Sequence, residues 1–357
     1  MPEYNIALIP GDGIGPEVVN EVVKVLKAIE ELSNIEFKME SFLWGSENYL
    51  KKGSVAPDNF IDILRPFDAI FLGAIGHPKV QDYISIGKLI FGLRRGFDQY
   101  VNYRPIKLLK GVDSPLKKNC PIDMLFIREN EEGEYGDIGG RSYPNTDREL
   151  AIQVALFTRY ETQRVMRFAF EQARLRRKHV TSITKSNALK HSMIFWDEIF
   201  EEVSKDYPDV KTDRVLVDAA AMYMVLEPER FDVVVTSNLF GDILTDLGAA
   251  LQGGLGFAPG ANLNPDKIYP SMFEPIHGSA PSLAGKGVAN PIAAIWSSSL
   301  MLDFLGEKIW AQKIMEAIEK VLVEGKIRTP DIGGKNSTSD MGDAIIEQLI
   351  RQDKTPG

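Results

Sequence analysis

Short apolar runs of β-forming residues alternate with longer amphipathic stretches along most of the chain. The apolar runs show little polar alternation, which is typical of strands that are buried on both faces. We expect strands at Asn5–Ile9, Ala69–Leu72, Val180–Ile183, Val215–Val217 and Val233–Val235. We expect helices at Glu17–Glu31, Phe157–Leu175, Phe195–Val203 and Leu239–Leu251. This alternation predicts an α/β fold.

Two segments interrupt the alternation. Glu129–Gly140 is rich in Glu and Gly, which predicts extended arms or hairpins. Gly253–Asn264 is rich in Gly, Pro and Asn and is the best candidate for a domain boundary. With 357 residues, the chain has the length of about two domains.

Composition narrows the class of protein. The chain is 44% hydrophobic and 25% charged, as in ordinary globular proteins. Its net charge of −9 argues against nucleic acid or an anionic membrane as the main partner. The basic run Arg174–His179 closes an expected helix, where cations complement the helix dipole.

The expected location is a reducing one such as the cytoplasm. Cys120 is the single cysteine, so it has no partner for an internal disulfide. The first ten residues read as a strand that contains Glu3, unlike a signal peptide. Ile292–Leu305 is the longest apolar stretch, and it is too short and too polar to span a bilayer.

A glycine-rich turn, Gly11-Asp-Gly13-Ile-Gly15-Pro16, follows the first expected strand and precedes a helix. It differs from the dinucleotide-binding fingerprint G-x-G-x-x-G because Pro16 occupies the sixth position. We therefore interpret it as a tight strand-to-helix turn with Pro16 in the first helical turn, rather than as a pyrophosphate site.

Arginines lie at the ends of several expected elements, where ligand sites of α/β proteins collect. Arg94 and Arg95 end an apolar run, Arg104 lies in Asn102–Pro105, and Arg128 follows the strand-like Ile122–Ile127. Planar guanidinium groups bind carboxylates in a bidentate manner, so three converging arginines would suit a dicarboxylate. Taken singly, each arginine is more typical of a surface ion pair, and convergence is not visible in the sequence.

Three aspartates form a candidate metal site. Asp218 ends the expected strand Val215–Val217, whereas Asp242 and Asp246 lie four residues apart and share one helix face. Together they could hold Mg²⁺ or Mn²⁺, which prefer oxygen ligands. Placement of acidic residues at a helix N-terminus is the alternative, and it explains Asp242 better than Asp246.

Tyr135 and Lys185 are the candidate proton carriers, because both side chains are titratable. Tyr135 lies in the irregular segment Glu134–Ile138, and Lys185 directly follows an expected strand. Of the histidines, His179 and His191 resemble surface residues, and none has zinc-ligand spacing to another or to Cys120. His277 lies among small residues that would let a nucleotide approach closely.

Taken together, these segments resemble the β-decarboxylating dehydrogenases, the family of isopropylmalate, isocitrate, tartrate and D-malate dehydrogenases. The resemblance covers essentially the whole chain. Its motifs are Ile9–Glu17, Arg128–Tyr135, Asn238–Asp246, Glu274–Pro281 and Asn290–Pro291. Within the family, Arg95–Pro105 is most similar to the tartrate/D-malate branch.

The resemblance implies a role for each candidate residue. Arg94, Arg104 and Arg128 would bind the substrate carboxylates, and Asp218, Asp242 and Asp246 would bind the divalent cation. Lys185 would act as the general base during hydride transfer, and Tyr135 would protonate the decarboxylated product.

The resemblance also implies the domain plan and the assembly. The fold would be the two-domain open α/β fold of isopropylmalate dehydrogenase, not a Rossmann dinucleotide fold. Residues 1–98 and 252–357 would form the cofactor-side domain, and residues 99–251 would form a second domain with a dimerisation arm. Family members are homodimers, in which Lys185 and Asp218 would complete the active site of the partner subunit.

The resemblance implies that NAD lies along Leu72–Gly76, Glu274–Leu283 and Asn290. The implied contact residues are Gly73, Glu274, His277, Gly278, Ser279, Ala280 and Asn290. NAD-using relatives commonly carry an aspartate where this chain has Ser282, and NADP-using relatives carry a Lys-Tyr pair that Ser282-Leu283 lacks. We expect NAD rather than NADP.

The helix before Arg94 departs from the family patterns. Isocitrate-specific relatives have Ser and Asn where this chain has Lys88 and Ile90, which disfavours isocitrate. Tartrate and D-malate relatives have Trp-Gly where this chain has Gly87-Lys88, and Ile90 and Phe91 leave room for an apolar substituent. Lys88 would either face solvent or meet a polar substituent.

The predicted function is NAD- and Mn²⁺- or Mg²⁺-dependent oxidation of D-malate or tartrate at C2 with β-decarboxylation. 3-Isopropylmalate dehydrogenase is the alternative within the family. A non-catalytic regulatory subunit of the same fold is the alternative from another class, and the intact set of Arg, Asp, Tyr and Lys residues argues against it.

Overall fold

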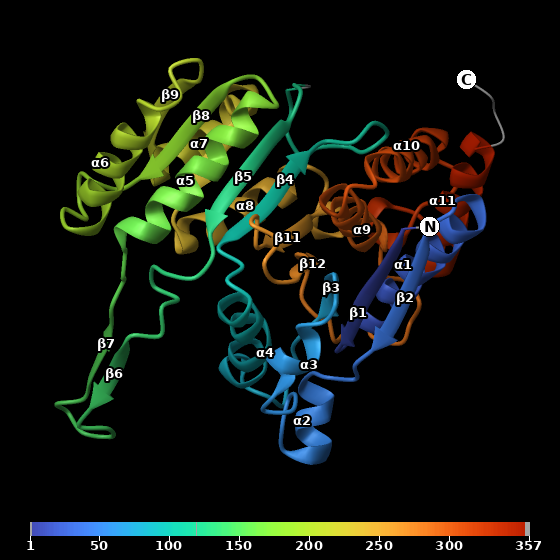
Figure 1. Ribbon diagram of the computed structural model, residues 1–357, viewed down its shortest axis with the longest axis horizontal. Helices are drawn as coiled ribbons and strands as arrows, with labels where there is room; N and C mark the ends of the chain where they lie inside the picture. The colour runs from blue at the N-terminus through green and yellow to red at the C-terminus, as the bar shows by residue number, and fades with distance from the viewer. Residues whose placement is uncertain (1, 119, 354–357) are drawn as a thin grey trace. The chain divides into compact units, whose positions relative to one another are not determined.

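The computed structural model describes residues 2–118 and 120–353, and they form two compact units (Figure 1). Unit 1 contains residues 1–99, 108–117 and 249–357, and unit 2 contains residues 100–107 and 118–248. Each unit combines a sheet with packed helices, so the predicted α/β class is confirmed.

The strands of unit 1 follow the order β2-β1-β3-β12-β11. β2, β1, β3 and β12 pair in parallel, and β11 is antiparallel to β12. All six residues of β3 are buried, as expected for a strand that is covered on both faces. The strands are β1 (Glu3–Gly11), β2 (Glu36–Ser41), β3 (Ala69–Ala74), β11 (Pro259–Leu263) and β12 (Ser271–Pro275).

The helices of unit 1 cover this sheet. α1 packs against β1 and β3, and α9 packs against β11 and β12. α1 begins at Gly15 with Pro16 in its first turn, as the sequence predicts. The helices are α1 (Gly15–Leu32), α2 (Ser46–Lys52), α3 (Phe60–Leu64), α4 (Asp82–Gly96), α9 (Ile292–Leu305), α10 (Lys308–Glu324) and α11 (Thr338–Asp353), with short 3₁₀ turns η2 (Leu255–Phe257) and η3 (Pro330–Ile332).

The strands of unit 2 follow the order β4-β5-β10-β8-β9. β4 is antiparallel to β5, and the other neighbours are parallel. A separate hairpin pairs β6 with β7, and Figure 1 shows it extending away from the other elements of unit 2. The strands are β4 (Val101–Lys107), β5 (Asp123–Glu129), β6 (Gly139–Ser142), β7 (Leu150–Gln153), β8 (His179–Thr184), β9 (Lys211–Leu216) and β10 (Val233–Thr236).

The helices of unit 2 pack on these strands. α5 begins where the Thr158 side chain accepts the Glu161 N–H, and its buried residues recur at helical spacing. α5 contacts β5, β10 and β8, and α7 contacts β9. The helices are α5 (Arg159–Arg174), α6 (Ser192–Ser204), α7 (Val217–Leu226) and α8 (Asn238–Leu251), with the 3₁₀ turn η1 (Pro228–Arg230).

The parallel strands of unit 2 bring chemically active residues to one edge. β5, β10, β8 and β9 are mutually parallel, so their carboxyl ends share an edge of the sheet. Arg128 lies near the end of β5, α8 follows β10, Lys185 follows β8, and Asp218 follows β9. Ligands of open α/β sheets bind at such carboxyl edges.

Three details of the sequence interpretation differ from the structure. The strand expected at Val215–Val217 ends at Leu216, because Val217 opens α7 with Asp218 in its first turn. The segment expected as a boundary, Gly253–Asn264, contains η2 and the fully buried β11, whereas the units divide between residues 248 and 249.

The third difference is the excursion of residues 108–117 into unit 1. Leu109 is buried there, and the Ser114 hydroxyl donates to the Leu251 carbonyl over 2.7 Å. Gly111 has a φ of +87°, and a Cβ on it would lie 2.5 Å from the Leu322 carbonyl oxygen. Such close packing is not visible in a single sequence.

The basic run Arg174–His179 has more specific partners than a helix dipole. Arg174 pairs with Asp209 over 2.8 Å. Arg176 pairs with Asp123 over 2.7 Å and with Asp232 over 2.8 Å. These ion pairs hold the end of α5 to the neighbouring loops, so the run serves the fold.

Candidate active site

Asp242 is the centre of a polar cluster in unit 2. It lies in the second turn of α8, and its side chain is 42% exposed. Its Oδ1 accepts a hydrogen bond from Arg128 Nη1 over 2.6 Å, and Arg104 Nη2 lies 3.9 Å from the same oxygen. Its Oδ2 accepts from the Tyr135 hydroxyl over 3.2 Å. The structure therefore brings four of the predicted site residues together.

Arg128 is buried and held by an uncharged residue as well as by Asp242. Asn238 Oδ1 accepts from Arg128 Nε over 3.0 Å and from Nη2 over 2.7 Å. The guanidinium carbon lies 5.5 Å from the centre of the Tyr135 ring, within cation–π range. Gly241 makes this arrangement sterically feasible, since a Cβ there would lie 2.6 Å from Arg128 Cγ.

Two arginines determine the charge state of Asp242. Burial alone would raise the pKa of this carboxyl, but Arg128 and Arg104 outweigh burial and hold the pKa below its usual value. Asp242 is therefore ionised at neutral pH.

Asp246 lies one turn further along α8, and its charge state is set differently. Partial burial raises the pKa of the Asp246 carboxyl, and the like charge of Asp242 raises it further against an opposing effect of Arg104. Among the described residues, Asp246 forms no hydrogen bond or ion pair. It is an exposed carboxylate that lies close enough to Asp242 for the two negative charges to repel each other.

This pair of carboxylates fits a divalent cation. Mg²⁺ and Mn²⁺ prefer oxygen ligands and retain positions for water and substrate. A cation would relieve the repulsion that raises the pKa of Asp246. The donor set of Asp242 and Asp246 is thus chemically suited to the predicted metal.

Lys185 and Asp218 form a separate pair in unit 2. Lys185 Nζ lies 2.9 Å from Asp218 Oδ1. The hydrogen bond from Lys185 lowers the pKa of the Asp218 carboxyl. Among the residues that the structure describes, the carboxylates of Asp218, Asp242 and Asp246 do not gather closely enough to share one ion within one chain. The three predicted metal ligands are therefore not assembled within one chain.

Arg94 lies near the end of α4 in unit 1 and is almost fully buried. Its Nη2 lies 3.6 Å from Glu274 Oε1, and that oxygen also accepts from Asn262 Nδ2 over 2.7 Å. Glu274 was expected to contact the cofactor, and the structure places its carboxylate beside Arg94. Arg95, by contrast, is exposed.

The N-terminal glycine turn is held by hydrogen bonds to other segments of unit 1. The Asp12 carboxylate is buried and accepts three backbone N–H groups, from Ser46 over 2.9 Å, Glu47 over 3.0 Å and Gly76 over 2.9 Å. Gly11 has a φ of +72°, and a Cβ there would lie 2.0 Å from the Ala74 carbonyl oxygen. The turn is therefore built for packing, as the Pro16 position indicates.

This turn packs against the predicted cofactor loop. The Ile14 N–H donates to the Ser279 carbonyl over 2.9 Å, and a Cβ on Gly13 would lie 1.9 Å from the same oxygen. Ala280 has a φ of +40°, an uncommon conformation for a residue with a side chain. These contacts define the path of the loop from Ser279 to Ala280.

His277 supplies an unused acceptor in that loop. Its Nδ1 lies 3.0 Å from the Gly278 carbonyl oxygen, which assigns the proton to Nδ1. Its Nε2 is buried and has no hydrogen-bond partner among the described residues. Burial lowers the pKa of the ring, so His277 is neutral at pH 7. A buried acceptor without a donor fits a site for a hydrogen-bonding ligand such as the cofactor.

Of the remaining predicted cofactor residues, Gly73 and Asn290 contact neighbouring residues of unit 1, whereas Gly278 is exposed. Gly73 packs against β1, where a Cβ would lie 2.3 Å from the Pro10 carbonyl oxygen. Asn290 Oδ1 accepts from the Ile292 N–H over 3.0 Å, and its Nδ2 donates to Asp331 over 2.9 Å. Gly278 is exposed, with no neighbouring atom where a Cβ would stand.

The residues that depart from the family pattern lie in unit 1. Lys88 is 35% exposed, and its Nζ lies 2.7 Å from Asp58 Oδ1. Gly87 has open space where a Cβ would stand, and Ile90 and Phe91 are partly buried. Ser282 is exposed. Lys88 therefore has an acidic partner within its own unit.

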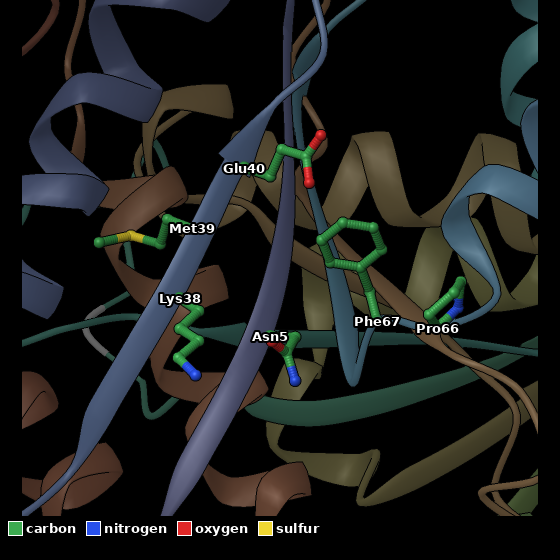
Figure 2. Close-up of a pocket in the computed structure, with 6 residues that line it drawn as sticks. All are labelled: Asn5, Lys38, Met39, Glu40, Pro66 and Phe67. Atoms are coloured by element: carbon green, nitrogen blue, oxygen red, sulfur yellow. The ribbon is translucent and has the colours of Figure 1, made fainter.

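A cavity of about 600 Å³ lies elsewhere in unit 1 (Figure 2). It is lined by Asn5, Lys38, Met39, Glu40, Pro66 and Phe67. Lys38 pairs with Glu3 over 2.8 Å, and Asn5 and Phe67 lie near the amino ends of β1 and β3. Ligands of α/β sheets bind at the carboxyl ends, so this cavity is not the predicted site.

Three residues of the cluster in unit 2 were missed by the sequence interpretation. They are Asn102, Asn238 and Thr245, which contact Arg104 or Arg128. A signal existed for Asn238, because it follows a buried strand and opens a helix at the carboxyl edge of the sheet. Nothing in the sequence distinguishes Thr245 from an ordinary helix residue.

Within residues 2–118 and 120–353, no helix has both the length and the apolar character needed to cross a membrane. The apolar stretch Ile292–Leu305 forms α9, which is buried against α10 and the sheet of unit 1.

Comparison with known proteins identifies the family. The chain is 49% identical over 351 residues to "Probable tartrate dehydrogenase/decarboxylase" of Bacillus subtilis, covering 98% of this chain and 99% of that protein. It is 47% identical over 361 residues to D-malate dehydrogenase [decarboxylating] of Escherichia coli, covering 98% of this chain and 100% of that protein.

The fold comparison agrees. The structure matches isocitrate dehydrogenase from Methylococcus capsulatus with a TM-score of 0.88 and 38% identity, covering 97% of this chain and 99% of that one. This confirms the predicted fold of the isopropylmalate and isocitrate dehydrogenases. Residues 5–345 match the model of the isocitrate/isopropylmalate dehydrogenase family. The chain belongs to the isocitrate/isopropylmalate dehydrogenase family.

Proposed function

We propose that this protein is a decarboxylating dehydrogenase that oxidises D-malate or tartrate at C2, with NAD as the hydride acceptor and Mn²⁺ or Mg²⁺ as the metal. The observation that carries the proposal is the cluster of Arg104, Arg128, Tyr135 and Asp242, beside which Asp246 has no partner. Full-length similarity to tartrate and D-malate dehydrogenases supports the choice of substrate.

Arginines bind the dicarboxylate in this proposal. Arg104 and Arg128 are both buried in unit 2, and a desolvated guanidinium attracts a carboxylate far more strongly than an exposed one. Arg94 of unit 1 supplies a third cation, held by Glu274. A substrate with two carboxylates binds more than one of these arginines.

Lys185 and Tyr135 carry the protons. Lys185 takes the proton of the 2-hydroxyl as the hydride leaves C2. The bond between C3 and its carboxylate then breaks with loss of CO₂, and Tyr135 returns a proton to C3. When bound, the divalent cation polarises the 2-hydroxyl and the nicotinamide accepts the hydride. Tyr135 is oriented for its task by Asp242, which accepts its hydroxyl hydrogen over 3.2 Å.

The metal ligands come from two chains in this proposal. Asp242 and Asp246 of one chain bind the cation together with Asp218 of the partner subunit. The partner subunit also contributes Lys185, which is paired with Asp218. That the three carboxylates do not gather into one group within a single chain supports this arrangement. Measuring Mn²⁺ binding by the dimer and by a monomeric variant tests it.

The exposed apolar surface of unit 2 supports a homodimer. α7 is apolar on almost all sides, yet only Ala220 and Met224 are buried. Such a helix is normally covered by protein. Met222 and Leu226 on α7 and Ile243 on α8 are 48%, 57% and 58% exposed. The β6–β7 hairpin also exposes Ile152 and serves as the dimerisation arm.

NAD is the proposed cofactor, bound by the loop from Glu274 to Ala280. The buried, unpartnered Nε2 of His277 supports this location. Ser282 and Leu283 are exposed and carry no charge to bind a 2′-phosphate. Turnover with NAD and NADP at equal concentration tests the choice, and a strong preference for NADP would overturn it.

A substrate panel tests the proposed reaction. D-malate, L-tartrate, meso-tartrate, 3-isopropylmalate and isocitrate are compared with NAD and Mn²⁺, with NADH and CO₂ as the products measured. We expect turnover of D-malate or tartrate. Turnover of none of the five, by protein that binds Mn²⁺, would instead indicate the regulatory subunit.

3-Isopropylmalate remains a second candidate because of one observation. Gly87 has open space on its Cβ side, about two turns before Arg94, and Ile90 and Phe91 lie between them. An apolar substituent would suit this helix face. Activity confined to 3-isopropylmalate would favour this candidate and leave the roles of the arginines, aspartates, Lys185 and Tyr135 unchanged.

A further inference from the structure

Arg104 is held by two uncharged acceptors. It lies on β4, opposite Phe126 of β5, and its side chain is buried. Its Nε donates to Asn102 Oδ1 over 2.6 Å, and its Nη1 donates to Thr245 Oγ1 over 2.5 Å. Because these bonds use two nitrogens of a planar group, they fix both the position and the plane of the guanidinium.

Thr245 is oriented for this contact by its own helix. It is buried on α8, and its hydroxyl donates to the Gly241 carbonyl over 2.7 Å, with the Asp242 carbonyl 3.2 Å away. A hydroxyl has one hydrogen, so this bond to the preceding turn leaves a lone pair for Arg104. Thr245 immediately precedes Asp246, so the hydroxyl ties Arg104 to the turn that bears both aspartates.

Arg128 is held in the same manner from the start of α8. Asn238 Oδ1 accepts from Nε and Nη2 of Arg128, over 3.0 and 2.7 Å. The amide nitrogen of Asn238 donates to the Glu132 carbonyl over 3.1 Å, which fixes which end of the amide faces Arg128. The acceptor is again neutral.

We propose that Thr245, Asn102 and Asn238 are positioning residues, which hold Arg104 and Arg128 in the geometry that binds the substrate carboxylates without adding negative charge to the Asp242 carboxylate already beside them. This rests on the proposed function, because it assumes that the two arginines bind a dicarboxylate. A carboxylate in place of any of the three acceptors would fix an arginine equally well, but it would add a second negative charge beside Asp242 and weaken the attraction for the substrate.

Thr245 allows a clean test. Thr245→Val keeps the shape of the side chain and removes the hydroxyl, and Thr245→Ser restores the hydroxyl. We expect Thr245→Val to raise the KM for D-malate or tartrate by about tenfold, the effect of losing one hydrogen bond to a charged group. Thr245→Ser keeps KM within about threefold of the original protein. The KM for NAD and the Kd for Mn²⁺ are unchanged in both variants.

Thr181→Val is the matched control. Thr181 is a buried residue of β8 in the same unit, and its hydroxyl has no hydrogen-bond partner among the described residues. The same substitution there leaves the KM for the dicarboxylate unchanged. Thermal unfolding midpoints of all three variants show how much of any effect comes from stability.

The outcomes separate the two proposals. Equal KM values for Thr245→Val and the original protein would overturn the positioning role. A matching rise in the KM values for dicarboxylate and NAD, without rescue by Thr245→Ser, would show a structural role instead. Calorimetric binding of D-malate without cofactor gives the same comparison independently of turnover. The proposed reaction fails separately if the original protein binds the dicarboxylate but does not oxidise it.

Discussion

Lys185 and Asp218 of one chain form an ion pair of 2.9 Å, at the carboxyl ends of β8 and β9. Asp242 and Asp246 are on α8, and the described residues do not bring Asp218 together with them in one chain. If Asp218 and Lys185 complete the site of a second chain, inactive variants of different chains should complement one another.

The complementation experiment combines Lys185→Met with Asp242→Asn. Each variant alone is inactive, because every site of its homodimer lacks one group. In a mixed dimer, one site contains both substitutions and the other contains neither. Co-expression of equal amounts should therefore restore about a quarter of the original activity. A mixture that stays inactive, although mixed dimers form, would contradict sharing of the site.

Asp246→Asn should weaken metal binding. The substitution keeps the size of the side chain and removes the charge that a cation would neutralise. We expect the Kd for Mn²⁺ to rise at least about tenfold, measured by calorimetry or by electron paramagnetic resonance. Glu198→Gln on the exposed face of α6 is the control. Equal Mn²⁺ affinity in both variants would remove Asp246 from the metal site.

His277→Ala should weaken cofactor binding without affecting the substrate. The substitution removes the buried Nε2 acceptor and the ring that carries it. We expect the KM for NAD to rise by about tenfold, with the KM for the dicarboxylate unchanged. His191→Ala, at an exposed histidine before α6, serves as the control. A rise only in the KM for the dicarboxylate would indicate that this loop binds the substrate rather than the cofactor.

Glu129 should make stability depend on pH. Burial raises its pKa from 4.5 to about 7, although it accepts the N–H groups of Glu131 and Glu132. Between pH 4.5 and 7 the unfolded chain has lost the proton that the folded protein still holds, so the free energy of unfolding falls as pH rises. The fall reaches about 3 kcal/mol and is complete above pH 7.

Glu129→Gln isolates this effect, because the amide does not titrate. Urea unfolding of both proteins at pH 5, 6, 7 and 8 gives the comparison. The original protein should lose stability relative to Glu129→Gln as pH rises from 5 to 7, and the difference should be constant above pH 7. A difference that is flat across this range would show that Glu129 is ionised throughout.

Charge on α7 should separate the dimer. Met222→Lys combined with Leu226→Lys places two cations on the exposed apolar face. We expect monomers in sedimentation experiments, together with loss of activity, since the proposed site needs two chains. Leu175→Lys is the control, at a leucine that is 80% exposed next to the end of α5. A dimer that survives the double substitution would place the interface elsewhere.

The sequence predicted the elements well because burial and helical spacing leave periodic patterns. α5 and α8 lie within two residues of their expected bounds. It predicted β11 wrongly as part of a boundary, since Pro259, Gly260 and Asn262 are typical of loops. Pairing with β12 overrides that local preference, and pairing across the chain is not encoded in local composition.

The site was predicted in part. Arg104, Arg128, Tyr135 and Asp242 were identified and do lie together. Thr245 was not, because its importance depends on a contact with Arg104, 141 residues earlier in the chain. Glu274 was assigned to the cofactor on the resemblance to the family, and the structure adds that its carboxylate lies beside Arg94.

The Asp12 carboxylate has one further consequence. It occupies the N-terminal end of α2, where the free N–H groups of Ser46 and Glu47 would otherwise attract a phosphate. Asp12 thus joins the glycine turn to α2 and to the segment that follows β3, since its carboxylate also accepts the Gly76 N–H. An apolar residue at position 12 would leave three backbone N–H groups without their acceptor, so the single charge of this turn serves the packing of unit 1 rather than a ligand.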